Sequence, residues 1–123
     1  MSLCLTGAGV SVALAWAAFT LSWTHTVEKV EWQEDWRVSS SGMQIVEARV
    51  KGTGAGMEPP PDARLDGGWW RYRPRVPTMP RLVLARSGVV DDWRLCRNGD
   101  CVTIGALLGT EAGSVTLSPC DRP

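Results

Sequence analysis

The stretch FTLSWTHTVEKVEWQEDWRV, residues 19–38, decides the fold because apolar and polar side chains alternate through most of it. From Phe19 to Val27 the odd positions carry large or apolar residues, and the even positions carry serine and threonine. Successive side chains of a strand point to opposite faces, so a period of two is typical of a half-buried β-strand. We therefore expect a strand here that buries Phe19 and Leu21 against a core.

The apolar phase changes within this same stretch. It occupies odd positions up to Val27 and even positions from Val30 onward, so one extra residue has to be absorbed near Glu28 and Lys29. A β-bulge would absorb it and would bring His25 and Glu34 to one face of the sheet. A plain turn between two strands is the alternative.

Short strand-like runs recur along the rest of the chain, with glycine, serine, asparagine or proline between them. The expected strands cover residues 3–7, 10–17, 31–38, 43–50, 69–73, 81–86, 92–97, 101–104 and 114–117. About eight or more short strands at this spacing predict an all-β fold, a single-domain sandwich or barrel of mostly antiparallel strands over residues 1–123. Only residues 104–113 are expected to hold a short helical turn.

The amino-terminal segment has a second interpretation. No formally charged residue occurs from Met1 to Val27, so residues 1–23 could be a leader or a membrane anchor in place of strands. A leader normally begins with lysine or arginine, and this segment does not. Its many serine, threonine and glycine residues favour strands, and membrane association stays open.

The composition describes an ordinary globular protein. The chain has 123 residues, 44% of them hydrophobic, and a formal net charge of zero. Its first 62 residues hold seven acidic and four basic residues, and the other 61 hold six and nine. The arginine-rich run WWRYRPRVP, residues 69–77, could stack on single-stranded nucleic acid, but a neutral chain favours arginines that pair with the acidic half. We expect no nucleic-acid partner.

Two of the four cysteines flank a strong turn signal. Asn98-Gly99 is typical of a two-residue type I′ hairpin turn, because both residues tolerate positive φ. Cys96 and Cys101 would then form the non-hydrogen-bonded pair next to the turn. Cα atoms of such pairs lie about 4.5 Å apart, which suits a disulfide.

The other two cysteines, Cys4 and Cys120, lie near opposite ends of the chain. A second disulfide would join them if the termini meet in adjacent strands. Two disulfides would indicate an oxidising compartment. Zinc binding by the cysteines together with His25 is the alternative, although a tight hairpin directs two thiols toward each other more readily than toward a metal.

Several polar side chains could form a site. His25 and four glutamates, Glu28, Glu31, Glu34 and Glu47, could bind a cation or a polar ligand. The alternative is a solvated strand face with a structural histidine. With one histidine and no nucleophile in a recognisable motif, we expect no enzyme and no cofactor.

Two motifs in this order and spacing resemble the bacterial family called domain of unknown function 1850. The first is FTLSWTHTVEK followed by Glu34, and the second is GTGAGMEPP at residues 52–60, with Glu47 between them in IVEARV. The resemblance covers residues 3–120. It implies a ligand-binding surface, which consists of His25, Thr26, Glu28, Glu34, Glu47, Gly54, Ala55 and Gly56. Thr26 replaces the usual serine and keeps its hydroxyl group.

The resemblance also implies a biological setting. The family has no assigned activity, and its members are often encoded beside TAXI-type TRAP transporter subunits. We therefore expect a non-enzymatic accessory or ligand-binding module whose partners are TRAP subunits or a small ligand. The expected compartment is the periplasm, and a cytoplasmic location stays open because the sequence shows no clear signal peptide.

Overall fold

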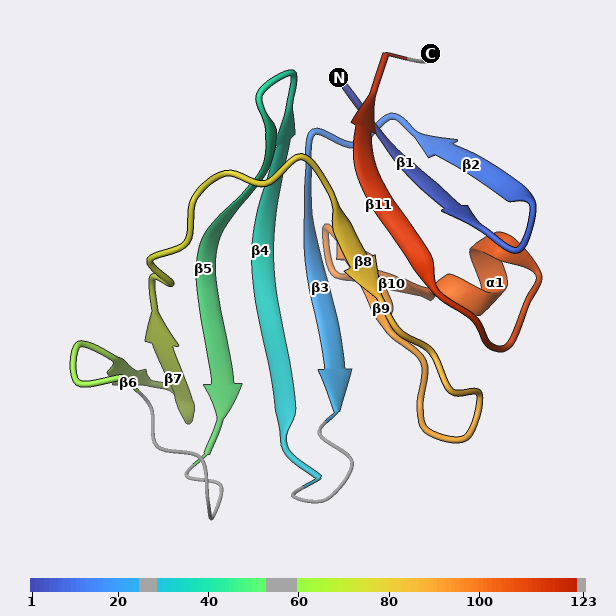
Figure 1. The fold of residues 1–123 in the computed structure, drawn as a ribbon. Coiled ribbons are helices and arrows are strands. Elements are labelled where there is room, and N and C mark those ends of the chain that lie inside the picture. The colour runs from blue at the N-terminus through green and yellow to red at the C-terminus, as the bar shows by residue number, and fades with distance from the viewer. Residues whose placement is uncertain (25–28, 53–59, 122–123) are drawn as a thin grey trace.

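Two antiparallel sheets make up the computed structural model, which describes residues 1–24, 29–52 and 60–121 (Figure 1). The seven-stranded sheet has the order β10-β9-β3-β4-β5-β7-β6, and the four-stranded sheet has the order β2-β1-β11-β8. The strands are β1 (Ser2–Gly7), β2 (Val10–Leu14), β3 (Ala18–Thr24), β4 (Glu31–Ser39), β5 (Gly42–Lys51), β6 (Arg64–Asp66), β7 (Trp69–Tyr72), β8 (Leu82–Leu84), β9 (Arg94–Arg97), β10 (Asp100–Thr103) and β11 (Val115–Cys120). The predicted all-β, sandwich-like fold is confirmed.

The stretch that decides the fold forms two neighbouring antiparallel strands, β3 and β4. Phe19 lies opposite Trp36 and Trp23 lies opposite Trp32, so the chain reverses between Thr24 and Glu31. The pairing shows two separate strands, as in the alternative interpretation, and not one bulged strand; Glu28, where the bulge was expected, lies outside the described residues. The apolar alternation changes phase there because residues 19–38 form two strands and not one.

A register shift does occur, in the next pair of strands. Asp35 lies opposite Glu47, whereas Trp36 lies opposite Ile45, which leaves Val46 as an extra residue on β5. A β-bulge of this kind moves every later side chain of its strand to the other face.

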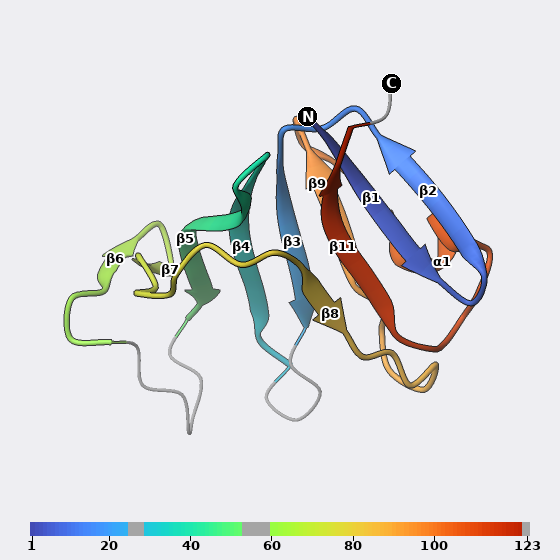
Figure 2. The ribbon, with the colours of Figure 1, turned by 45° about the horizontal axis from the view of Figure 1, so that its top comes forward.

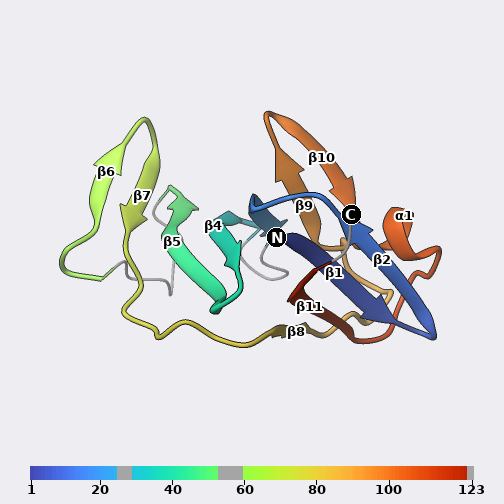
Figure 3. The ribbon, with the colours of Figure 1, turned by 90° about the horizontal axis from the view of Figure 1, so that it is seen from above.

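The four-stranded sheet covers part of one face of the seven-stranded sheet, as Figures 2 and 3 show. We call the covered face, which carries Leu21 and Trp36, the inner face, and the opposite one the outer face. Leu3, Leu5 and Leu117 of the smaller sheet are fully buried in the same core cluster as these two residues. Burying a leucine stabilises the fold by about 2 kcal/mol, so this cluster holds the two sheets together.

Both expected disulfides are present. Asn98 and Gly99 have φ angles of 54° and 85°, as a type I′ turn requires, and Cys96 and Cys101 lie opposite each other with a Cα–Cα distance of 4.0 Å. The Cys4–Cys120 disulfide joins β1 to β11, at the end of this strand pair where β1 begins and β11 ends (Figure 1).

One short helix and one short strand complete the fold. The helix α1 (Ile104–Leu108) confirms the expected helical turn; the Thr103 hydroxyl accepts a hydrogen bond from the Ala106 N–H, and Gly109 ends the helix with φ of 75°. The sequence did not predict β6, because its three residues are all exposed and show no apolar pattern. No helix within the described residues is long and apolar enough to cross a membrane.

The two disulfides should differ in their effect on stability. Removal of the Cys4–Cys120 bridge frees a loop with a sequence separation of 116, whereas Cys96 and Cys101 are separated by 5. In the chain-entropy model, the double variant Cys4→Ala/Cys120→Ala should lose about 5 kcal/mol of unfolding free energy, and Cys96→Ala/Cys101→Ala about 2 kcal/mol. Urea unfolding of the two oxidised variants measures both losses. Equal losses, or a larger loss for the hairpin variant, would contradict this ordering.

Candidate functional site

Most of the residues expected to form the ligand-binding surface lie outside the described residues. These are His25, Thr26, Glu28, Gly54, Ala55 and Gly56. Their role, and the metal site that would use His25, stay predictions. Glu34 and Glu47 are the two members of the set that the structure describes.

Glu34 and Glu47 lie on opposite faces of the seven-stranded sheet. Glu34 is opposite Leu21 and Ala48, which places it on the inner face, and Glu47 is opposite Asp35 on the outer face. The bulge at Val46 causes this separation, because it turns the part of β5 that follows it to the other face. The structure therefore does not bring the two glutamates into one site.

Glu34 is a half-buried carboxyl group among aromatic side chains. Burial raises its pKa, and the hydrogen bond that Trp36 Nε1 donates at 3.1 Å lowers it by less. Burial also raises the pKa of the Tyr72 hydroxyl, and the charge of Glu34 raises it further. Glu34 and Tyr72 both oppose Ala48 in neighbouring strands, so they share the inner face.

Two further tryptophans lie on the inner face, at the end of the sheet where β3 and β5 stop. Trp32 and Trp70 both lie opposite Val50, one from each side. Each has a buried indole N–H, and neither forms a hydrogen bond with residues 1–24, 29–52 or 60–121. A buried donor without an acceptor costs about 1–3 kcal/mol. The indole N–H groups of Trp32 and Trp70 are therefore two donors for which the described residues supply no acceptor.

Glu47 belongs to an ion-pair network on the outer face. Its carboxylate accepts hydrogen bonds from Arg71 Nη1 at 2.7 Å and from Arg49 Nη1 at 3.2 Å. Arg49 also donates to Asp35 Oδ2 at 2.8 Å and to Gln33 Oε1 at 2.7 Å. Glu47 is thus held through Oε1 by two arginines.

Asp35 is the second carboxylate that holds Arg49. Burial alone would raise the pKa of Asp35, but hydrogen bonds from Arg49 and Thr20, together with the charge of Arg49, outweigh burial and lower it. The Thr20 hydroxyl donates to Asp35 Oδ1 at 2.7 Å. This network ties β3, β4 and β5 together across the outer face and gives Asp35 of the opening stretch a structural role.

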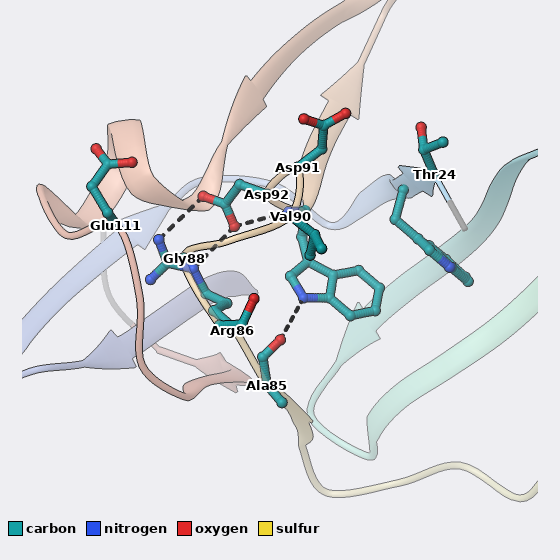
Figure 4. A pocket seen from close by; sticks show the side chains of 11 residues that line it. Thr24, Ala85, Arg86, Gly88, Val90, Asp91, Asp92 and Glu111 are labelled. Carbon is teal, nitrogen blue, oxygen red and sulfur yellow. Dashed lines mark hydrogen bonds and ion pairs between the residues drawn. The ribbon is translucent and has the colours of Figure 1, made fainter. Parts of the chain in front are cut away.

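A pocket with a volume of about 210 Å³ lies where β3 ends, between Trp23 and the loop that joins β8 to β9 (Figure 4). We call it the tryptophan pocket, because the rings of Trp23 and Trp93 meet in its wall with centroids 5.0 Å apart. Trp23 also stacks on Trp32, and Trp93 Nε1 donates to the Ala85 carbonyl oxygen at 2.9 Å. These contacts fix both rings of the wall.

An internal ion pair holds the pocket loop in place. Arg86 has a side chain that is only 2% exposed, and its Nε donates to Asp92 Oδ1 at 3.0 Å. Asp92 Oδ2 accepts from the Gly105 N–H at 2.6 Å, and Arg86 also contacts the carbonyl and hydroxyl oxygens of Thr110. The charge of Arg86 is therefore neutralised inside the fold, and the loop is tied to the start of α1.

Two other carboxylates line the tryptophan pocket. Asp91 and Glu111 have no hydrogen bond and no ion pair within the described part of the chain, and Figure 4 shows them on either side of the Arg86–Asp92 pair. Because Arg86 is already neutralised, the pocket carries a net negative charge. Aromatic walls with carboxylates beside them suit an organic cation.

Sequence reasoning missed this pocket. Its residues come from β3 and from segments more than 60 positions later, and no pattern in the sequence brings those segments together. The one available signal was Asp91-Asp92-Trp93, acidic residues next to a tryptophan. Within residues 1–24, 29–52 and 60–121, no group of three histidine, cysteine, aspartate or glutamate side chains is placed to hold a metal ion.

Comparison with known proteins identifies one family. A family model described as "Domain of unknown function (DUF1850)" matches residues 19–104. No curated protein and no solved structure matches the chain. The matched range runs from the first residue of the opening stretch to the start of α1, so it includes β3, Glu34 and both tryptophans of the pocket wall.

The raised pKa of Glu34 predicts a pH dependence of stability. The folded protein keeps the Glu34 proton above the ordinary pKa of 4.5, so the free energy of unfolding should fall as pH rises from 4.5 through the raised folded pKa. Glu34→Gln should lack this component. Its stability relative to the wild type should therefore be greater at neutral pH than in acid, as urea unfolding at several pH values would measure.

Glu111→Gln is the matched control, because it removes the same formal charge from an exposed position. The buried position of Glu34 would be contradicted if the stability difference between Glu34→Gln and the wild type stayed constant with pH or changed in the opposite direction.

Proposed function

The chain belongs to the family described as domain of unknown function 1850, and on that premise we propose that it is a non-enzymatic accessory module of TRAP-type (TAXI) solute uptake that binds a small organic cation. The proposed binding site is the tryptophan pocket. It is a different site from the surface expected from the sequence, most of which lies outside the described residues and stays a prediction.

The charge and shape of the pocket carry the proposal. Trp23 and Trp93 line the pocket with two indole rings, and an ammonium group over the face of such a ring gains about 0.5–2 kcal/mol. Asp91 and Glu111 supply negative charge that no arginine or lysine of the described residues neutralises. The neighbouring Arg86 does not repel a cation strongly, since its guanidinium group is paired with Asp92.

The size of the pocket limits the ligand. Sites for drug-sized ligands span roughly 300–1,000 Å³, and this pocket is smaller, at about 210 Å³. A ligand with only a few non-hydrogen atoms fits such a volume. Tetramethylammonium is therefore a suitable probe, and tert-butanol is a neutral molecule of similar shape.

The proposed compartment is the periplasm. Disulfides form and persist in oxidising compartments, and all four cysteines of this chain are paired. The proposed association with TRAP transport rests on the family resemblance, since members of the family are often encoded beside TAXI-type subunits.

Isothermal titration calorimetry tests the binding proposal. The wild type should bind tetramethylammonium saturably and should bind tert-butanol at least tenfold more weakly, because the indole faces and carboxylates act on the charge. Asp91→Asn/Glu111→Gln should weaken tetramethylammonium binding at least tenfold. In the native host, the same double variant should reduce solute uptake through the neighbouring TRAP transporter.

Asp66→Asn/Asp100→Asn is the matched control, since it removes two carboxylates that do not line the pocket. Equal binding of tetramethylammonium and tert-butanol, or equal weakening by the two double variants, would contradict the cation site. Unchanged uptake in a strain whose protein no longer binds the probe would contradict the role in transport.

A further inference from the structure

Three arginines lie in a row on the outer face of the seven-stranded sheet. Arg49 of β5 is directly opposite Arg71 of β7, and Arg71 is directly opposite Arg64 of β6. Side chains at directly paired positions of an antiparallel sheet point to the same face, with Cβ atoms about 5 Å apart. Like charges in such pairs repel, so the row has an electrostatic cost that other groups must offset.

Carboxylates offset that cost for part of the row only. Arg49 is held by Asp35 and Glu47. Arg71 binds Glu47 at 2.7 Å but meets Asp66 at 3.4 Å, and the Asp66 side chain is 74% exposed. Arg71 Nε is buried and has no hydrogen bond to any described residue, so the contact with Asp66 is a loose ion pair that leaves this donor unsatisfied there.

The end of the row has no carboxylate partner. Arg64 is exposed and has no ion pair or hydrogen bond in the described part of the chain, and the same holds for Arg73, two positions after Arg71. Arg64 and Arg73 line a groove of about 620 Å³ with Arg71, and its other lining residues are Leu65, Tyr72 and three carboxylates, Glu47, Asp62 and Asp66. Figure 3 shows the β6–β7 hairpin rising from β5 on the side away from β8, which is the outer face.

The chemistry of this groove suits an anion with two charged groups. A guanidinium group presents N–H donors in a planar fork that matches carboxylate and phosphate oxygens. We propose that the groove is an anion site in which Arg64 and Arg73 bind a small dianion carrying carboxylate or phosphate groups, with Arg71 between them. The bound charge relieves the repulsion along the arginine row, and the exposed Asp66 side chain turns away into solvent.

This site is separate from the tryptophan pocket in position and in charge preference. The pocket is lined by residues of β3 and the β8–β9 loop together with Glu111, and the groove by Glu47 of β5 and residues 62–73 in and around β6 and β7. Each binding proposal can therefore be supported or contradicted independently of the other.

Calorimetric titration at constant ionic strength tests the anion site, with succinate, inorganic phosphate and acetate as probes. Succinate or phosphate should bind the wild type saturably, and the tighter of the two shows whether the site prefers carboxylate or phosphate groups. Acetate should bind at least tenfold more weakly, because it can engage only one arginine. Arg64→Gln/Arg73→Gln should weaken binding of the dianion at least tenfold.

Two controls keep the test specific. Arg81→Gln/Arg97→Gln makes the same change in net charge at exposed positions outside the groove and should leave dianion binding unchanged. Arg64→Gln/Arg73→Gln should not lower the thermal unfolding midpoint, because it removes like-charge repulsion, and it should keep the wild-type tetramethylammonium affinity. No saturable dianion binding by the wild type, acetate binding as tight as succinate binding, or equal weakening by the two double variants would overturn the proposal.

Discussion

The pairing of β3 with β4 is the constraint on which the rest of the structure depends. It places Phe19 opposite Trp36 on the inner face and Thr20 opposite Asp35 on the outer face. The first pair enters the hydrophobic core beneath the four-stranded sheet, and the second belongs to the ion-pair network around Arg49. A shift of one residue in this pairing would exchange the two faces and would bury the charged network, so the register is strongly specified.

The bulge at Val46 determines what each face of the sheet can do. Before it, Met43 and Ile45 face the core; after it, Ala48 and Val50 do. Because of this change, Glu47 joins Arg49 and Arg71 on the outer face and does not join Glu34. The inner face keeps one half-buried carboxyl group among aromatic residues, and the outer face carries the arginine row. The proposed dianion site depends on this outer arginine row, whereas the proposed cation site takes its charge from the loop residues Asp91 and Glu111.

The sequence predicts features that depend on neighbouring residues and misses those that depend on distant ones. Alternation predicts β3 and β4, and Asn98-Gly99 predicts the hairpin and the Cys96–Cys101 disulfide, because each signal lies within one short segment. The face of Glu47 could not be predicted, since the bulge is defined by pairing with β4. The tryptophan pocket was missed for the same reason: Trp23 and Trp93 meet only through the packing of strands far apart in the chain.

Native-state hydrogen exchange measured by NMR tests the central claim most directly. If the rest of the structure depends on the β3–β4 pairing, the backbone amides of these strands should exchange only through global unfolding, with the full free energy that urea unfolding gives. The amides of β6, whose three residues are all exposed, should exchange through local opening at a lower free energy. Exchange of the β3 and β4 amides through local opening, at a free energy as low as that of β6, would contradict the account.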